Sequence, residues 1–281
     1  MPMCADAAMR LDRLLTTLAV GSRSQVKTML RAGRVTVNGQ VVRSADAHVQ
    51  PGDRLTLDQQ PLDARTTRHV LLNKPCGVLT AARDPKQPTV LDLLPPAYRA
   101  CGCMPVGRLD KDTSGLLVAA KNNEAHLKLS EQLKARKAVR KYIALVNGNI
   151  KEDSGTINKP IGRSSADRKK MAVTANGREA VTHYNVLERF GRYTLTECVL
   201  ETGRTHQIRV HMASIGHSLV GDKTYGIKKE KFNLPGQLLH ARTIGFVHPS
   251  TGEMMRFSSE LPDYFSDVIE KLRAEKERNF K

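Results

Sequence analysis

Two short segments of the chain place ionisable side chains at spacings that could carry out chemistry. The first, Gly107–Gly115, reads GRLDKDTSG and sets Asp110 and Asp112 among cations in a turn bounded by glycines. The second, Gly203–His211, reads GRTHQIRVH and offers polar groups that could converge on the first. A carboxylate beside arginines is suited to acid–base or nucleophilic chemistry on a polyanion.

The composition predicts the same kind of partner. The formal net charge is +17, far beyond what solubility requires, and such a surplus is typical of proteins that bind nucleic acid or an anionic membrane. No apolar run is long enough to span a bilayer, and the start at Met1–Asp6 lacks the order of a secretion signal. We therefore expect a cytoplasmic protein that binds RNA or DNA and no membrane.

The five cysteines are scattered and odd in number, as is usual for reduced thiols in a cytosolic protein. Cys101 and Cys103 could form half of a metal site, but no second closely spaced pair completes it. His206 and His211 lie five residues apart and would point to different faces of a helix, so they are poorly placed to bind one metal ion together. Hydrogen bonding or RNA contact is the favoured role for each. The sequence predicts no metal and no cofactor.

A compact pattern occupies residues 10–58. Leucines recur at helical spacing from Leu11 to Leu18, and Ser22 is a suitable N-cap for a second helix. The pair Asn38-Gly39 between short apolar runs predicts a β-hairpin. Two helices followed by small strands, with the strings VNGQVV and VQPGDRL, resemble the S-four (alpha-L) RNA-binding domain. We expect a flexible stretch over 1–9, this small α/β domain over 10–58, and a polar linker over 59–68.

Short β-rich runs alternate with turns and a few helices beyond residue 69. The predicted strands include Lys141–Val146, Val181–Val186 and Tyr193–Leu200, and Leu116–Ala120 is predicted to be a buried strand. Thr205 is a suitable N-cap for a helix over 206–215, and apolar spacing after Phe265 predicts a C-terminal helix. These patterns predict an α+β domain over 69–281 with a mixed, largely antiparallel sheet.

Both chemistry-bearing segments resemble signature motifs of the pseudouridine synthases, enzymes that isomerise uridine within RNA. The resemblance covers roughly residues 10–250 and implies a central RNA-binding cleft and a reaction that needs no cofactor. Residue chemistry by itself does not decide which of Asp110 and Asp112 is catalytic. The family motif implies that Asp110 is the catalytic residue, and Asp112 is assigned the structural role of fixing the turn. Arg209 resembles the arginine that pairs with the catalytic aspartate and would keep it ionised.

Other residues are assigned by the same resemblance, each beside a plainer structural interpretation. Tyr142, at the head of a strand, could be a core residue, but the motif implies stacking on the target base and proton removal at carbon 5. Arg108 could be a surface phosphate contact; the resemblance implies that it fills the gap left by a flipped uridine. Arg204, His206 and Leu239 are predicted to contact the substrate. Asn73-Lys74-Pro75 is expected to shape the cleft wall.

The motifs resemble two different branches of the family. Residues 201–226 resemble the large-subunit ribosomal branch, whereas residues 73–94 and Pro105-Val106-Gly107 resemble the branch that contains the small-subunit enzyme. We therefore expect a monomeric pseudouridine synthase acting on ribosomal RNA, most readily that of the large subunit. The alternatives are a non-catalytic RNA-binding ribosome-assembly factor on the same scaffold, or the same activity on transfer RNA. The basic loop over 159–170 is either an RNA clamp or a solvated loop.

Overall fold

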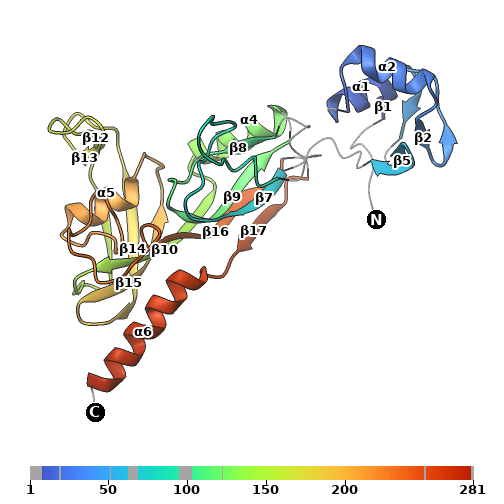
Figure 1. Ribbon diagram of the computed structural model, residues 1–281. Coiled ribbons are helices and arrows are strands. Elements are labelled where there is room, and N and C mark those ends of the chain that lie inside the picture. Colours follow the sequence, from blue (N-terminus) through green and yellow to red (C-terminus); the bar gives the residue numbers. More distant parts are fainter. Residues whose placement is uncertain are drawn as a thin grey trace.

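The protein contains two β-sheet units, each with its own apolar core (Figure 1). The computed structural model describes residues 8–18, 20–50, 52–62, 69–94, 103–121, 123–249 and 251–279. The predicted linker residues 63–68, most of the predicted flexible N-terminus and Cys101 lie outside these ranges. Within them, none of the helices combines the length and the apolar character that crossing a membrane would need.

The N-terminal unit packs two helices, α1 (Leu11–Thr17) and α2 (Arg23–Arg31), against small strands. As predicted, Ser22 caps α2, in a reciprocal capping box with Gln25. The Asn38-Gly39 turn has positive φ at both residues, as its hairpin requires. The strands are β1 (Met9–Arg10), β2 (Val35–Val37), β3 (Gln40–Val41), β4 (His48–Val49), β5 (Leu55–Leu57) and β6 (Gln60–Leu62), and their sheet order is β3-β2-β5-β6 beside a separate β1-β4 pair.

Two predicted boundaries of this unit are wrong. Met9 pairs with Val49 in β1, so ordered structure begins before residue 10. Gln60–Leu62 was predicted to belong to a linker, but it forms β6 and pairs with β5. Gln60–Leu62 gives little β signal in the sequence because it is short and contains Pro61. Proline is tolerated here because β6 lies at the edge of its sheet.

The second unit is built on a nine-stranded sheet with the order β11-β14-β15-β10-β16-β9-β7, and β17 and β8 pair with β16 and β9. All pairings between these strands are antiparallel except the one between β16 and β9, which agrees with the predicted mixed, largely antiparallel sheet. Its strands are β7 (His69–Lys74), β8 (Met104–Val106), β9 (Ser114–Ala120), β10 (Val139–Asn147), β11 (Ser154–Asn158), β14 (Val181–Arg189), β15 (Tyr193–Leu200), β16 (Leu239–Val247) and β17 (Met254–Ser258).

Helices cover both faces of the central strand β10. Ala144 and Val146 face a core that includes residues of α5 (Gln207–Ser214). The alternate residues Ile143 and Leu145 face the core that α6 (Asp263–Asn279) closes, as the predicted C-terminal helix requires. Tyr142 therefore lies on the α5 side of the sheet. A third helix, α4 (Asn123–Lys134), packs near β8 and β9 (Figure 1).

The predicted basic loop over 159–170 takes part in a hairpin. Its strands β12 (Ile161–Arg163) and β13 (Met171–Val173) pair outside the main sheet. Arg168, Lys169 and Lys170 are exposed at its tip. Each of the two strands has only three residues, which is too short for an apolar period to predict a strand.

Candidate active site

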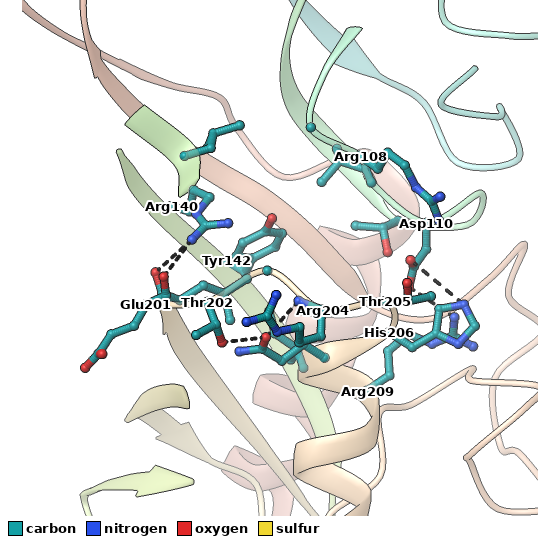
Figure 2. A pocket seen from close by; sticks show the side chains of 18 of the residues that line it. Arg108, Asp110, Arg140, Tyr142, Glu201, Thr202, Arg204, Thr205, His206 and Arg209 are labelled. Carbon is teal, nitrogen blue, oxygen red and sulfur yellow. Dashed lines mark hydrogen bonds and ion pairs between the residues drawn. The ribbon is translucent and has the colours of Figure 1, made fainter. Parts of the chain in front are cut away.

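A cavity of about 660 Å³ opens between the turn that contains Asp110, the head of β10 and the segment that leads into α5 (Figure 2). All the site residues predicted from the sequence line it: Arg108, Asp110, Tyr142, Arg204, His206, Arg209 and Leu239. Asp112 is not among the lining residues. The fold thus distinguishes Asp110, which lines the cavity, from Asp112, which does not, whereas residue chemistry could not tell them apart.

Lys74 stabilises the turn before β9 through hydrogen bonds to backbone carbonyls. This side chain is fully buried, and its ammonium donates to the carbonyl oxygens of Pro75, Val78 and Lys111 at 3.0, 2.9 and 2.7 Å. All three donors of the ammonium are therefore used within the protein. Burial lowers the pKa of Lys74 to about 8. Lys74 thus stabilises the turn that carries Asp110, and it is not among the residues that line the cavity.

Arg209 connects two carboxylates. Its Nη1 donates to Oδ2 of Asp110 at 3.1 Å, and its Nε and Nη2 bind Asp222 in bidentate geometry at 2.7 and 2.9 Å. Burial by itself lowers the pKa of Arg209, but the hydrogen bonds and charge of Asp222 and Asp110 raise it above its ordinary value. Arg209 is therefore a permanent cation in this site.

Asp222 is buried behind Arg209, with its side chain 0% exposed. Its Oδ1 also accepts the backbone N–H groups of Thr224 and Tyr225 at 2.8 and 3.0 Å. Burial opposes ionisation, but the hydrogen bond from Arg209 holds the pKa of Asp222 below its usual value. Asp222 keeps the guanidinium in one orientation, so the edge offered to Asp110 is fixed.

His206 occupies the N-cap of α5 with a left-handed backbone, φ 57°. The predicted cap, Thr205, lies one residue too early, and no side chain caps this helix. A non-glycine residue in this region is unusual and is often found at functional sites. The conformation directs the ring toward Asp110, whose Oδ1 lies 4.0 Å from Nε2 of His206 (Figure 2). Burial lowers the pKa of His206, which favours the neutral ring.

Tyr142 reaches the cavity because side chains alternate along β10, which places it on the same face as Ala144. The register shift between β10 and β16 at this point leaves Arg242 of β16 as the extra residue. Lys141 pairs instead with Glu197, at 2.9 Å. Burial raises the pKa of Tyr142, so its phenol stays protonated at neutral pH. Leu239, which is 4% exposed, adds apolar surface to the cavity wall.

The cavity continues to a charged end beyond Arg204. Nε of Arg204 donates to the carbonyl of Glu179 at 2.8 Å. Arg136 pairs with Glu179 at 2.6 Å and with Glu201 at 3.5 Å. Arg140, beside Tyr142, donates to the carbonyl of Glu201 at 3.0 Å (Figure 2). Cations thus gather at this end of the cavity, as a polyanionic ligand would require.

Sequence reasoning gave no role to two residues that organise the site, Asp222 and Tyr225. Both belong to the string GDKTYG over 221–226, within the stretch 201–226 that resembles the large-subunit branch. Tyr225 lies beneath the guanidinium of Arg209, 5.1 Å from ring centroid to Cζ. Within the described ranges, no three His, Cys, Asp or Glu side chains cluster in a way that could hold a metal ion.

Comparison with known proteins identifies the family. The model of the family described as RNA pseudouridylate synthase matches residues 68–214, and that of the S4 domain matches residues 9–55. An uncharacterized RNA pseudouridine synthase of Bacillus subtilis, YlyB, is 43% identical over 94% of this chain and 94% of its own. The chain belongs to the RNA pseudouridine synthase family.

Other relatives agree with this assignment. The protein named ribosomal large subunit pseudouridine synthase D of Pseudomonas aeruginosa is 40% identical and is matched over 95% of this chain and 93% of its own length. Among solved structures, the human RNA Pseudouridylate Synthase Domain Containing 1 is 28% identical, with a TM-score of 0.59 over 73% of this chain and 91% of its own. The protein is therefore an RNA pseudouridine synthase, an isomerase whose substrate is RNA.

Proposed function

We propose that this pseudouridine synthase modifies uridine in large-subunit ribosomal RNA and that Asp110 acts at the sugar of the target nucleotide. The choice of RNA is supported by the name of the Pseudomonas relative, which is 40% identical along nearly the whole chain. The role of Asp110 is supported by one observation above all. Asp110 lines the cavity, and its carboxylate accepts a hydrogen bond from Arg209, which the buried Asp222 holds from behind.

The reaction is an isomerisation, so its atoms balance within one nucleotide. The bond between C1′ of ribose and N1 of uracil breaks, the detached base turns, and C1′ joins C5. The proton on C5 is lost and N1 gains one. Positive charge develops at C1′ as the first bond breaks, and a carboxylate there stabilises the charge or bonds to the carbon. Asp110 is the residue to which we assign this step.

Tyr142 and Arg108 are assigned to holding the everted nucleotide. Tyr142 offers a flat ring in the cavity, on which uracil would stack. Its raised pKa disfavours proton removal, since little phenolate exists at neutral pH, and therefore favours the stacking role. Flipping a uridine costs a few kcal/mol of stacking, and Arg108 at the cavity mouth would offset part of this cost by filling the vacancy.

Arg204, His206 and Leu239 are assigned to substrate contact. Leu239 would pack against the base, while Arg204 lies at the charged end, where phosphates flanking the target would bind. The N-terminal unit is assigned to RNA binding over residues 9–62, with the catalytic unit beginning at residue 69. Cytoplasmic location and a monomeric state stay predictions from the sequence.

The assigned role of Asp110 is tested by Asp110→Asn. This change keeps shape and removes the charge, so we expect loss of isomerisation on an RNA fragment with affinity within about twofold, since the phosphate contacts are untouched. Asp112→Asn is the matched control, because Asp112 belongs to the same turn and does not line the cavity. Turnover by Asp110→Asn, measured by mass spectrometry of the released nucleosides, would refute the assignment.

The target is tested separately by mapping pseudouridines in cells with and without the gene. We expect one or more large-subunit positions to lose the modification and to regain it when the wild-type protein, but not Asp110→Asn, is restored. Loss confined to transfer RNA or to the small subunit would overturn the target and leave the chemistry intact.

A further inference from the structure

The hydroxyl of Tyr225 joins two groups that are far apart in the chain. It lies 2.9 Å from the backbone nitrogen of Met171 in β13 and 2.9 Å from Nδ1 of His206. A backbone N–H can only donate, so the Met171 contact uses a lone pair of the phenol oxygen. The oxygen keeps a second lone pair, so the direction of its contact with His206 follows from the other ring nitrogen: Nε2 faces the acceptor-only carboxylate of Asp110, which favours a proton on Nε2 and donation from Tyr225 to Nδ1. Burial raises the pKa of Tyr225, which keeps the phenol proton in place at neutral pH.

This direction of the hydrogen bond goes with one histidine tautomer. A neutral His206 whose Nδ1 accepts from Tyr225 carries its proton on Nε2. Nε2 is the atom that faces Oδ1 of Asp110, at 4.0 Å. The other carboxylate oxygen, Oδ2, accepts from Arg209. The two oxygens of Asp110 thus face different donors, a cation on one side and an uncharged N–H on the other.

Neutrality of His206 matters for the charge of the site. Asp110 and Asp222 carry two negative charges and Arg209 one positive charge, so the group retains one negative charge while His206 is neutral. A protonated His206 would cancel it. A retained negative charge near C1′ is what a developing oxocarbenium-like centre needs.

We propose that Tyr225 is a positioning residue that sets the tautomer and orientation of His206 and thereby presents Nε2–H to Asp110 and its bound nucleotide. The proposal rests on the proposed function of Asp110. Tyr225 makes four contacts that suit it to this role. Its backbone N–H donates to Asp222 and its ring lies under Arg209, while its hydroxyl contacts both the backbone nitrogen of Met171 and Nδ1 of His206. The hydroxyl of Tyr225 therefore links the β12–β13 hairpin to the active site, beside the apolar packing of Ile161 and Met171 with Val210.

The test uses Tyr225→Phe in the full-length enzyme. Phenylalanine keeps the ring under Arg209 and removes only the hydroxyl. Tautomers are determined from ¹⁵N–¹H multiple-bond spectra of the imidazoles, with the His206 signals assigned by their loss in His206→Gln. In the wild type we expect a protonated Nε2 and an unprotonated Nδ1. In Tyr225→Phe we expect mixed tautomers, and kcat on an RNA fragment lower by about tenfold to 100-fold with KM within about twofold.

Tyr184→Phe is the matched control, because Tyr184 is a buried tyrosine of the same unit that does not line the cavity. It should leave both the His206 signals and kcat unchanged. A wild-type His206 protonated on Nδ1 would overturn the proposal, and so would Tyr225→Phe with unchanged tautomers, whatever its activity. The NMR measurement needs no substrate. A tautomer that depends on Tyr225 in an enzyme inactive on large-subunit RNA would uphold this inference and refute only the target.

Discussion

At the scale of single residues, the site depends on one guanidinium shared between two carboxylates of different exposure. Asp222 is fully buried and makes two hydrogen bonds to Arg209, whereas Asp110 is 20% exposed and makes one. The two carboxylates therefore have different roles. Asp222 holds the cation, and Asp110 keeps lone pairs that face the cavity.

Removing the charge of Asp222 should therefore damage both stability and catalysis. Asp222→Asn leaves the buried Arg209 without its main counter-charge, a change that typically costs about 3–5 kcal/mol. We expect a loss of this size in urea unfolding and a reduced kcat, because Arg209 is no longer held. Asp153→Asn is the control: Asp153 also pairs with an arginine but its side chain is 90% exposed, so the cost should stay below about 1 kcal/mol. Equal effects of the two variants would contradict this account.

At the scale of elements, the turn that carries Asp110 is placed by a close approach of two parallel strands. Gly115 in β9 pairs with Ala241 in β16, and a Cβ on Gly115 would lie 2.4 Å from the carbonyl oxygen of Ala241. Its φ of +111° also favours glycine. The spacing between Asp110 and the wall formed by Leu239 and Tyr142 depends on this contact.

Gly115→Ala should push the turn away from β16. We expect a loss of unfolding free energy of about 3 kcal/mol, from backbone strain and overpacking together, and a clear fall in kcat. Gly191→Ala is the matched control, because Gly191 also has positive φ, +74°, and a Cβ there would meet nothing within 4 Å. It should cost only about 1 kcal/mol and leave kcat unchanged. A Gly115→Ala enzyme with normal kcat would show that the close approach does not position Asp110.

At the scale of the whole molecule, two separate apolar cores let the N-terminal unit and the catalytic unit fold around different residues. Most of the net positive charge lies on the second unit, since residues 1–68 hold ten Lys/Arg against six Asp/Glu. The N-terminal unit is therefore better suited to positioning RNA than to supplying the bulk of the electrostatic attraction.

Deletion of residues 1–62 should weaken RNA binding without removing chemistry. The boundary follows β6, which pairs within the N-terminal unit. We expect the truncated enzyme to modify a short RNA fragment with a kcat within about threefold of wild type and a higher KM, because the cavity is intact. The logarithm of its affinity should fall less steeply with salt, since fewer phosphate contacts release counterions. A folded truncation that is inactive on every fragment would contradict the assigned division of roles.

Buried histidines should make the whole protein sensitive to mild acid. Burial lowers the pKa of His69, His206, His211 and His240, to about 4 for His240, which is 1% exposed. Between this value and the ordinary 6.5, the unfolded chain binds more protons, so stability falls as pH falls through that window, by about 3 kcal/mol for His240. Urea unfolding at pH 7 and pH 4.5 should show a smaller decrease in His240→Gln, whereas the exposed His48→Gln should behave as wild type.

Local patterns predicted much of the architecture. The capped second helix, the Asn38-Gly39 hairpin, the strands β9, β10, β14 and β15, and helix α6 all follow from spacing and turn chemistry, which act over a few residues. Strand β6 and the β12–β13 hairpin were missed because strands of only three residues are too short to show an apolar alternation. His206 was not expected at the N-cap, because its left-handed backbone is imposed by its surroundings.

The family, the basic character and the set of side chains available for chemistry can be inferred from the chain alone, because they depend on residue types and short-range spacing. Three features are visible only in the folded protein: which aspartate reaches the cavity, which carboxylate lies behind Arg209, and how Tyr225 joins β13 to His206. These contacts join residues that are distant along the chain, and their geometry exists only once the sheet and α5 have packed.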